Sequence, residues 1–237
     1  MHVRPFSRQG TAAWSRPPRY ASWRGARSPL VVATSWLAGS VPFAQLVAQR
    51  CTGIDLRTVG TGTVSGSALY HVAGTGPLVV AGVLDVAKGA VGPVLAGADR
   101  PALQAAAAAA AVCGHDWSPW LGGAGGRGVS VALGALTVVE PMAAAGLLGT
   151  LTLGRLAGDN AGVATLVGWG VVAAVLRARR GRHGTLLAVA LVAPMAVKRL
   201  AGNGPAQDGA TYLWRTLYDR DSRHEMRPRR AVGVRAR

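Results

Sequence analysis

The 237-residue sequence is poor in charged side chains, and few of those it has are acidic. Only 15% of its residues are Asp, Glu, Lys or Arg, whereas ordinary soluble domains contain about 25%. Cysteine is scarce too: Cys51 and Cys113 form neither a CxxC pair nor a Cys/His cluster. This spacing does not suit a zinc site, and two unpaired small hydrophobic side chains are favoured over a single disulfide. We predict no metal and no cofactor.

The sequence is rich in small apolar residues and in Arg. Half of the residues are hydrophobic, and 33 are Gly; Gly and Ala let helix backbones approach closely in a bilayer. The net charge is +16, and it is concentrated towards the two ends of the chain. Residues 1–29 hold six Arg and no acid, and residues 177–237 hold fourteen Lys or Arg against four acids. This segregation favours a membrane bundle with basic tails over a soluble helical protein or a nucleic-acid binder.

The apolar residues fall into blocks of helical length. The six candidate helical blocks are Leu30–Gln49, Gly76–Gly97, Ala102–Cys113, Val129–Leu153, Ala161–Leu176 and Gly184–Val197. An uncharged helix of about 20 residues crosses a hydrocarbon core of ~30 Å. Together with a short re-entrant helix at 65–74, the blocks predict an all-α, polytopic integral membrane bundle of about six to seven spans. It has a re-entrant or broken glycine-rich segment.

Three regions follow from this pattern: a basic, disordered N-terminal extension (1–29), a membrane domain (30–203) and a basic cytoplasmic tail (204–237). Pro42 is expected to kink the first block. The positive-inside rule places both 177–182 and the C-terminal tail in the cytoplasm. Both can lie there only if Gly184–Val197 does not cross, and the sequence leaves this open.

Glycine-rich and ionisable segments inside an apolar chain are costly unless they line a polar cavity. The first such segment is DLRTVGTGTVSGS (55–67). Its glycines expose backbone N–H groups to an anion, and its hydroxyl and guanidinium groups add donors. The residues concerned are Arg57, Gly60, Thr61, Gly62, Thr63, Ser65, Gly66 and Ser67. A flexible polar loop is the structural alternative.

Two further segments carry charge. Asp85 and Lys88 lie three residues apart on one helix face, where they could neutralise each other or bind substrate. The segment GHDWSPWLGGAGGRG (114–128) precedes a predicted helix at Val129. Its N–H groups, the helix dipole and Arg127 would converge on an anion. It includes His115, Gly125, Gly126 and Gly128. It lacks the GK[ST] ending of a Walker loop.

In order and spacing, these segments resemble the bacterial acyl-phosphate:glycerol-3-phosphate acyltransferases, the PlsY family. The resemblance begins at GSVPF (39–43), continues through DLR (55–57) and GTG (60–62), and includes Asp85 with Lys88 and Gly89. Its strongest part is GHDWSPWLGGAGGRGVSVALG (114–134), which is similar to the family pattern GHxFPxxxxFxGGKGVATxxG. It covers about residues 35–200, most of the chain.

The resemblance implies a multi-pass enzyme of the plasma (inner) membrane with its active site facing the cytoplasm. Such an enzyme transfers a fatty acyl group from acyl phosphate to the 1-hydroxyl of glycerol 3-phosphate in phospholipid synthesis. By carry-over, Arg127, the 125–128 backbone, Thr61 and Ser67 would hold the donor phosphate. Arg57, His71 and Lys88 would be candidates for the acceptor phosphate. The sequence does not indicate an oligomeric state or an acyl-chain preference.

The chain departs from the family pattern at several polar positions. Two family Asn positions are Thr63 and Ala68, a family Arg is His71, and the family Lys of GGKG is Arg127. In the family motif HRENIxRL, which aligns with residues 193–200, the His and Asn positions are both Ala. His71, Asn160 or Asn203 could replace part of the lost chemistry. The alternative hypothesis is a catalytically eroded membrane paralogue that binds acyl phosphate or phospholipid without turnover.

Overall fold

A computed structural model describes residues 20–157, 161–206 and 208–218, and every regular element in these ranges is helical. Nine α-helices and two short 3₁₀ turns occur in this part of the chain. Their bounds are α1 Tyr20–Ser40, α2 Phe43–Thr52, η1 Leu56–Thr58, α3 Gly66–Ala73, α4 Thr75–Ala96, α5 Pro101–Asp116, η2 Pro119–Leu121, α6 Val129–Val139, α7 Pro141–Leu156, α8 Ala161–Ala201 and α9 Gly209–Tyr218.

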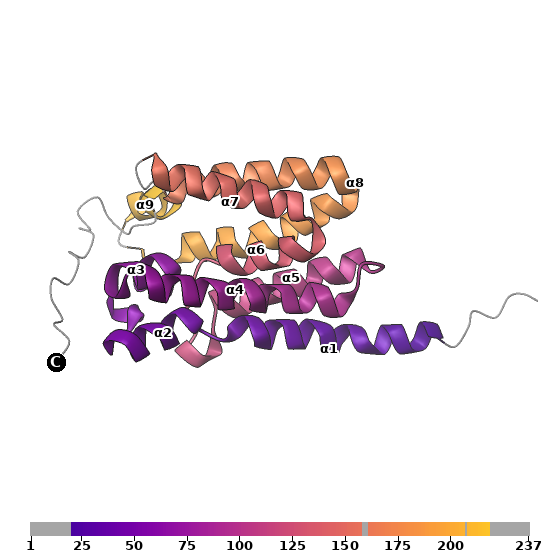
Figure 1. The fold of residues 1–237 in the computed structure, drawn as a ribbon, viewed down its shortest axis with the longest axis horizontal. Coiled ribbons are helices and arrows are strands. Elements are labelled where there is room, and N and C mark those ends of the chain that lie inside the picture. Colours follow the sequence, from indigo (N-terminus) through magenta and orange to yellow (C-terminus); the bar gives the residue numbers. More distant parts are fainter. Residues whose placement is uncertain (1–19, 158–160, 207, 219–237) are drawn as a thin grey trace, which may run out of the picture.

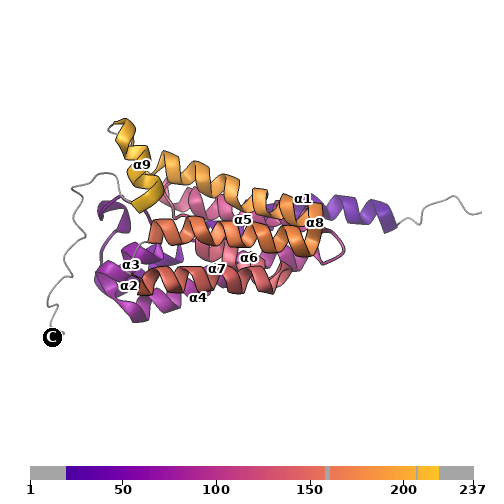
Figure 2. The ribbon, with the colours of Figure 1, turned by 90° about the horizontal axis from the view of Figure 1, so that it is seen from above.

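The long helices lie side by side along the longest axis of the molecule (Figures 1 and 2). Helix α1 packs on α5, α4 on α6, and α7 on α8, while α5 also packs on α8. Buried Ala, Val and Leu side chains of α5, α6, α7 and α8 form the main core. The short helices α2, α3 and α9 gather at one end of the bundle (Figure 1).

Glycines allow these helices to pack backbone against backbone. A Cβ on Gly134 of α6 would lie 1.9 Å from the carbonyl oxygen of Val86 of α4, and one on Gly89 would lie 2.0 Å from that of Val131. Likewise, a Cβ on Gly39 of α1 would lie 2.2 Å from the carbonyl oxygen of Ala111 in α5. Only residues without a side chain fit these crossings, as expected for helix pairs that associate in lipid.

Two apolar blocks are divided differently from the sequence expectation. The first block breaks into α1 and α2 at Val41–Pro42 instead of kinking, because proline cannot continue the hydrogen-bond ladder. Pro141 likewise starts a new helix and separates α6 from α7. The last two blocks stay separate as the two halves of α8, which turns back on itself (Figure 1) at Gly181, where φ is 56° and ψ is −133°.

After the turn in α8, Gly184–Val197 runs from one end of the bundle to the other. Glu140, after the end of α6, binds Arg179 and Arg180, whereas Asn203 binds Gly125, before the start of α6. Arg179 and Arg180 therefore lie at the opposite end of the bundle from Asn203, so Gly184–Val197 crosses it. Glu140 is buried and its carboxylate accepts from Arg179 Nε at 2.9 Å and Arg180 Nε at 3.0 Å.

The outer surface of the bundle is apolar, and the polyhelical membrane architecture is confirmed. Among the described residues, three helical stretches are long and apolar enough to cross a membrane: Arg27–Thr52, Thr75–Ala96 and Gly162–Ala201. Many of their large hydrophobic side chains point outwards, for example Val83 and Val189. A soluble protein rarely exposes so much apolar surface, but lipid tails would cover it.

Helical structure extends beyond the membrane domain expected from hydropathy. Helix α1 begins at Tyr20, ten residues before the first apolar block, because a helix can continue past the lipid-facing stretch that hydropathy detects. Helix α9 lies in the stretch expected to be a tail. Its N-terminus is capped by Asp208, whose carboxylate accepts from the backbone N–H of Thr211 at 2.8 Å and from its hydroxyl at 2.9 Å.

Candidate functional site

The two glycine-rich segments predicted to bind phosphate meet at the end of the bundle that carries α2 and α3. Val64 N–H donates to Gly125 O at 3.0 Å, and Gly126 N–H donates to His115 O at 3.2 Å. Asn203, just after α8, holds both segments, because its Nδ2 donates to Gly62 O at 2.8 Å and to Gly125 O at 3.1 Å. Segments 60 to 140 residues apart in sequence thus form one site.

Glycine is required where the second segment folds against the end of α5. A Cβ on Gly125 would lie 2.3 Å from His115 O, and one on Gly126 would lie 2.2 Å from His115 Nε2. Gly128, at φ 68°, adopts the left-handed conformation that starts α6. The GGRG stretch is therefore in close contact with the His115 ring, and its backbone has no space for side chains other than that of Arg127.

Arg127 and two threonines connect the two segments through their side chains. Arg127 is 9% exposed, and its Nη2 donates to Thr63 Oγ1 at 3.4 Å. Thr61 Oγ1 lies 2.8 Å from the same oxygen. The predicted proximity of Arg127 and Thr61 is therefore found, and Thr63, a predicted hydroxyl donor at a family Asn position, bridges them.

A second cluster surrounds Lys88. Its buried Nζ lies 2.8 Å from Asp85 Oδ1 and donates to Val41 O at 2.6 Å. The same nitrogen lies 3.0 Å from His115 Nδ1. An ammonium group has no lone pair, so Nδ1 must be the acceptor in this contact. The remaining proton of a neutral His115 is therefore on Nε2, which faces the glycine-rich segment.

Two charged residues of the site were not predicted from the sequence. Lys198 of α8 is 2% exposed; its Nζ donates to Gly123 O at 3.3 Å and lies 5.3 Å from the centre of the Trp117 ring. Asp116 is 0% exposed, and neither carboxylate oxygen has a hydrogen-bond partner. The sequence offers two signals that could have identified them: Lys198 directly follows an apolar block, and Asp116 is an acid within a largely apolar motif.

Other predicted site residues lie at the edge of this cluster. Arg57 is half exposed and pairs with Asp55 at 2.6 Å. Hydrogen bonds from the Arg57 side chain and backbone hold the pKa of the Asp55 carboxyl below its usual value. His71 packs edge-on against Tyr70 of α3, and Ser67 is exposed in the first turn of that helix. Asn160 lies outside the described residues.

Gly60 and Gly62 both adopt positive φ in the turn before Thr63. Gly66, in the first turn of α3, packs against Leu78 of α4, whose Cδ1 would lie 2.9 Å from a Cβ at this position. These three predicted glycines thus shape the loop that carries Thr61 and Thr63.

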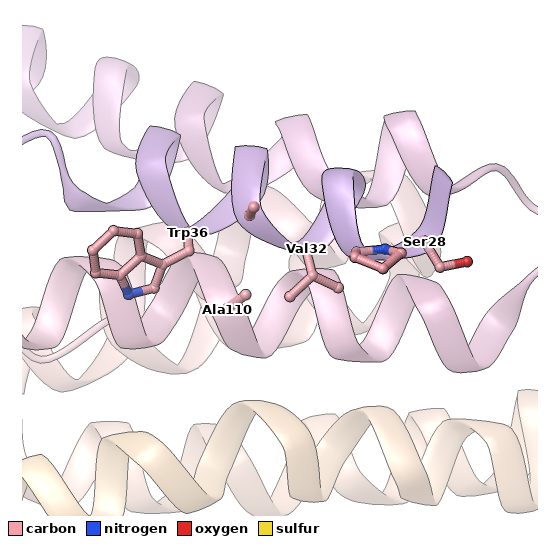
Figure 3. Close-up of a pocket in the computed structure, with 6 residues that line it drawn as sticks. Ser28, Val32, Trp36 and Ala110 are labelled. Atoms are coloured by element: carbon pink, nitrogen blue, oxygen red, sulfur yellow. The ribbon is translucent and has the colours of Figure 1, made fainter. Parts of the chain in front are cut away.

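A groove and a cavity lie near the site. The groove, of about 540 Å³, runs along α1 from Ser28 to Trp36 against Ala110 of α5 (Figure 3). It is almost wholly apolar, and its Trp36 end lies one helical turn before Ser40, which accepts from Ser118 Oγ and Trp120 Nε1. The cavity, of about 480 Å³, is lined by Val41, Gln45, Arg57 and Trp120, among others. An apolar groove therefore leads towards a partly polar cavity at the site end of the bundle.

A family model described as glycerol-3-phosphate acyltransferase matches residues 29–203. The chain belongs to the glycerol-3-phosphate acyltransferase family. Curated members include a glycerol-3-phosphate acyltransferase of Myxococcus xanthus, 41% identical over 117 residues, which are 48% of this chain and 61% of that protein. One from Anaeromyxobacter dehalogenans is 41% identical over 128 residues, covering 51% and 63% of the two chains. The matched region thus spans about three fifths of the length of these curated relatives.

Two solved structures of the glycerol-3-phosphate acyltransferase family resemble the whole bundle. The crystal structure of PlsY (YgiH), an integral membrane glycerol 3-phosphate acyltransferase, in its glycerol 3-phosphate form gives a TM-score of 0.67 at 25% identity. The alignment covers 73% of this chain and 88% of that one. The lysophosphatidic acid form of that protein gives 0.62 at 22% identity, which supports the fold alone. The matched family region includes α2 to α8 and stops before α9.

Proposed function

We propose that the protein transfers a fatty acyl group from acyl phosphate to the 1-hydroxyl of glycerol 3-phosphate. The observation that carries the proposal is the convergence of Arg127, Thr61 and Thr63 where the two glycine-rich segments meet. Lys198 borders the same segments from α8. Guanidinium, ammonium and hydroxyl donors in a largely buried site suit phosphate, which both substrates carry.

The chemistry requires little beyond positioning and charge stabilisation. The hydroxyl oxygen of glycerol 3-phosphate attacks the carbonyl carbon of the mixed anhydride, and the bond from that carbon to the phosphate oxygen breaks. The phosphate leaves with the electron pair, and the hydroxyl proton passes to it. Donors around the phosphate stabilise the charge that develops on it, an effect worth ~10²–10³ in rate for one positioned donor. The acyl phosphate is already activated, so no covalent enzyme intermediate is needed.

Lys88 has an indirect role in the proposed mechanism. Its ammonium group forms an ion pair with Asp85 and makes hydrogen bonds to Val41 O and His115 Nδ1. We infer that Lys88 orients His115, whose Nε2–H then faces the glycine-rich segment. Contact of Lys88 with the acceptor phosphate stays a prediction, as do the assignments of Arg57, His71 and Ser67.

The test is acyl transfer by the purified protein with acyl phosphate and labelled glycerol 3-phosphate. The proposal predicts labelled lysophosphatidate, lost in Arg127→Ala and retained in Thr58→Val, a change on an exposed threonine of the other glycine-rich segment. Acyl coenzyme A in place of acyl phosphate distinguishes the donor class. No product with any donor, from protein that still folds, contradicts the proposal.

We further propose that the chain resides in the plasma membrane with the site facing the cytoplasm. Cys51, exposed at the end of α2, marks the site end of the bundle. In a Cys113→Ser variant, a membrane-impermeant maleimide should label inside-out vesicles and leave intact cells unlabelled. Labelling of intact cells contradicts this orientation.

A further inference from the structure

Helix α9 lies outside the matched family region, yet one of its side chains is built into the end of α8. Arg215 is 1% exposed. Its Nη1 donates to Leu200 O at 3.1 Å and to Ala201 O at 2.7 Å. Its Nη2 donates to Gly204 O at 2.9 Å and lies 3.5 Å from Pro205 O. One guanidinium group thus binds four backbone carbonyls on both sides of Gly202.

The location explains why these carbonyls need an external donor. The last carbonyls of an α-helix have no N–H partner within the helix, and the C-terminus carries partial negative charge. Leu200 and Ala201 are the last two residues of α8. Gly202, at φ 64°, ends the helix, and a Cβ there would lie 2.5 Å from Arg215 Cζ. The guanidinium group therefore packs directly on the glycine that ends the helix.

The capped segment carries two residues that hold the candidate site together. Asn203 follows Gly202 and donates to Gly62 O and Gly125 O, one in each glycine-rich segment. Lys198, one turn earlier, donates to Gly123 O. The contacts form a continuous path from Arg215 through Gly202 and Asn203 to the loops that carry Thr61, Thr63 and Arg127.

We propose that Arg215 is a positioning residue, which fixes the end of α8 so that Asn203 and Lys198 hold the two glycine-rich segments in register for phosphate binding. The inference deepens the proposed function and rests on it for the identity of the ligand. Arg215 acts from α9, which lies outside the residues that the family model matches.

The first experiment measures hydrogen–deuterium exchange on the full-length protein in detergent, without substrate. In Arg215→Ala, backbone amides of 202–206 and of the segments 60–64 and 123–126 should exchange about tenfold faster or more, since hydrogen bonds to a charged group are lost. Thr216→Ala is the matched control, because its hydroxyl binds only Tyr212 O within α9 among the described contacts. Wild-type exchange in all three segments of Arg215→Ala overturns the proposal.

The second experiment separates positioning from simple loss of folding. Arg215→Ala should raise the KM for acyl phosphate on the order of tenfold, and millimolar guanidinium should lower it again by refilling the site. Arg215→Lys should fall between wild type and Ala, because an ammonium group lacks the planar fork. If Arg215→Ala does not fold, faster exchange confined to the same segments in Arg215→Lys supports the role, and wild-type exchange overturns it. If the wild type transfers no acyl group, the proposed function fails while the exchange comparison still decides the role of Arg215.

Discussion

The close crossing of α4 and α6 allows a quantitative prediction, because it couples helix packing to the position of the Lys88 cluster. In Gly134→Ala, the new Cβ starts 1.9 Å from Val86 O, whereas real Cβ contacts essentially never fall under 3.0 Å. The helices must therefore separate by about 1.1 Å or more at this point. Overpacking of this kind costs roughly 1–3 kcal/mol, and the better helix propensity of Ala offsets roughly 0.5–1 kcal/mol of it.

The effect on activity should exceed the effect on stability. Val86 lies between Asp85 and Lys88 on α4, so displacement of this helix moves the ammonium group that orients His115. A misplacement of about 1 Å can cost ~10²-fold in rate. We expect Gly134→Ala to lose on the order of 10- to 100-fold in acyl transfer while its thermal midpoint falls by a few degrees.

Gly82→Ala on the same helix is the matched control, since a Cβ there meets nothing within 4 Å. It should keep wild-type activity and an equal or higher thermal midpoint. Both variants are compared by thermal unfolding in detergent and by acyl transfer. Wild-type stability and activity in Gly134→Ala would refute the reasoning, because the helices would then have to be less closely packed than the structure shows.

Substitutions at three further positions test the site and the distal end of the bundle. Arg127→Ala should reduce the rate of acyl transfer by ~10²–10³. Arg127→Lys should be milder because it restores the charge. If both variants react as fast as the wild type, Arg127 is not part of the anion site. Thr63→Val keeps the side-chain shape but removes the hydroxyl that binds Arg127, so the rate should fall about tenfold, and an unchanged rate in a steady-state assay would contradict the bridging role. Glu140→Gln should lower the free energy of unfolding by about 1 kcal/mol at low salt without changing the KM for either substrate. Thermal midpoints measured at several salt concentrations check this. A rise in KM would contradict the separation of Glu140 from the candidate site at the other end of the bundle.

The membrane architecture and the two glycine-rich segments could be predicted because they depend on local sequence. Apolar block length and charge segregation indicate an all-helical membrane bundle, and glycine spacing indicates the segments at 55–67 and 114–128. The helix breaks inside the apolar blocks were harder to place. The blocks continue past Pro42 and Pro141 by hydropathy, so stretches that the sequence predicts as continuous are each two helices.

The candidate site was predictable only in part, because it depends on contacts between distant segments. Arg127 and Thr61 were identified from the glycine-rich motifs in which they occur. Thr63 was expected to add a hydroxyl donor, but its place between the other two side chains depends on how the segments fold together. Lys198 reaches the site through the antiparallel return of α8 after Gly181, and the sequence left open whether this part of the chain crosses the bundle.

The central claim is that the clustered donors serve acyl transfer from acyl phosphate to glycerol 3-phosphate. The most direct test measures inorganic phosphate and lysophosphatidate together, on purified protein, with and without glycerol 3-phosphate. The account predicts one phosphate released for each lysophosphatidate formed, and no release above background when glycerol 3-phosphate is omitted or Arg127 is replaced by Ala. Phosphate release that does not depend on glycerol 3-phosphate, or binding of acyl phosphate with no product, would contradict it.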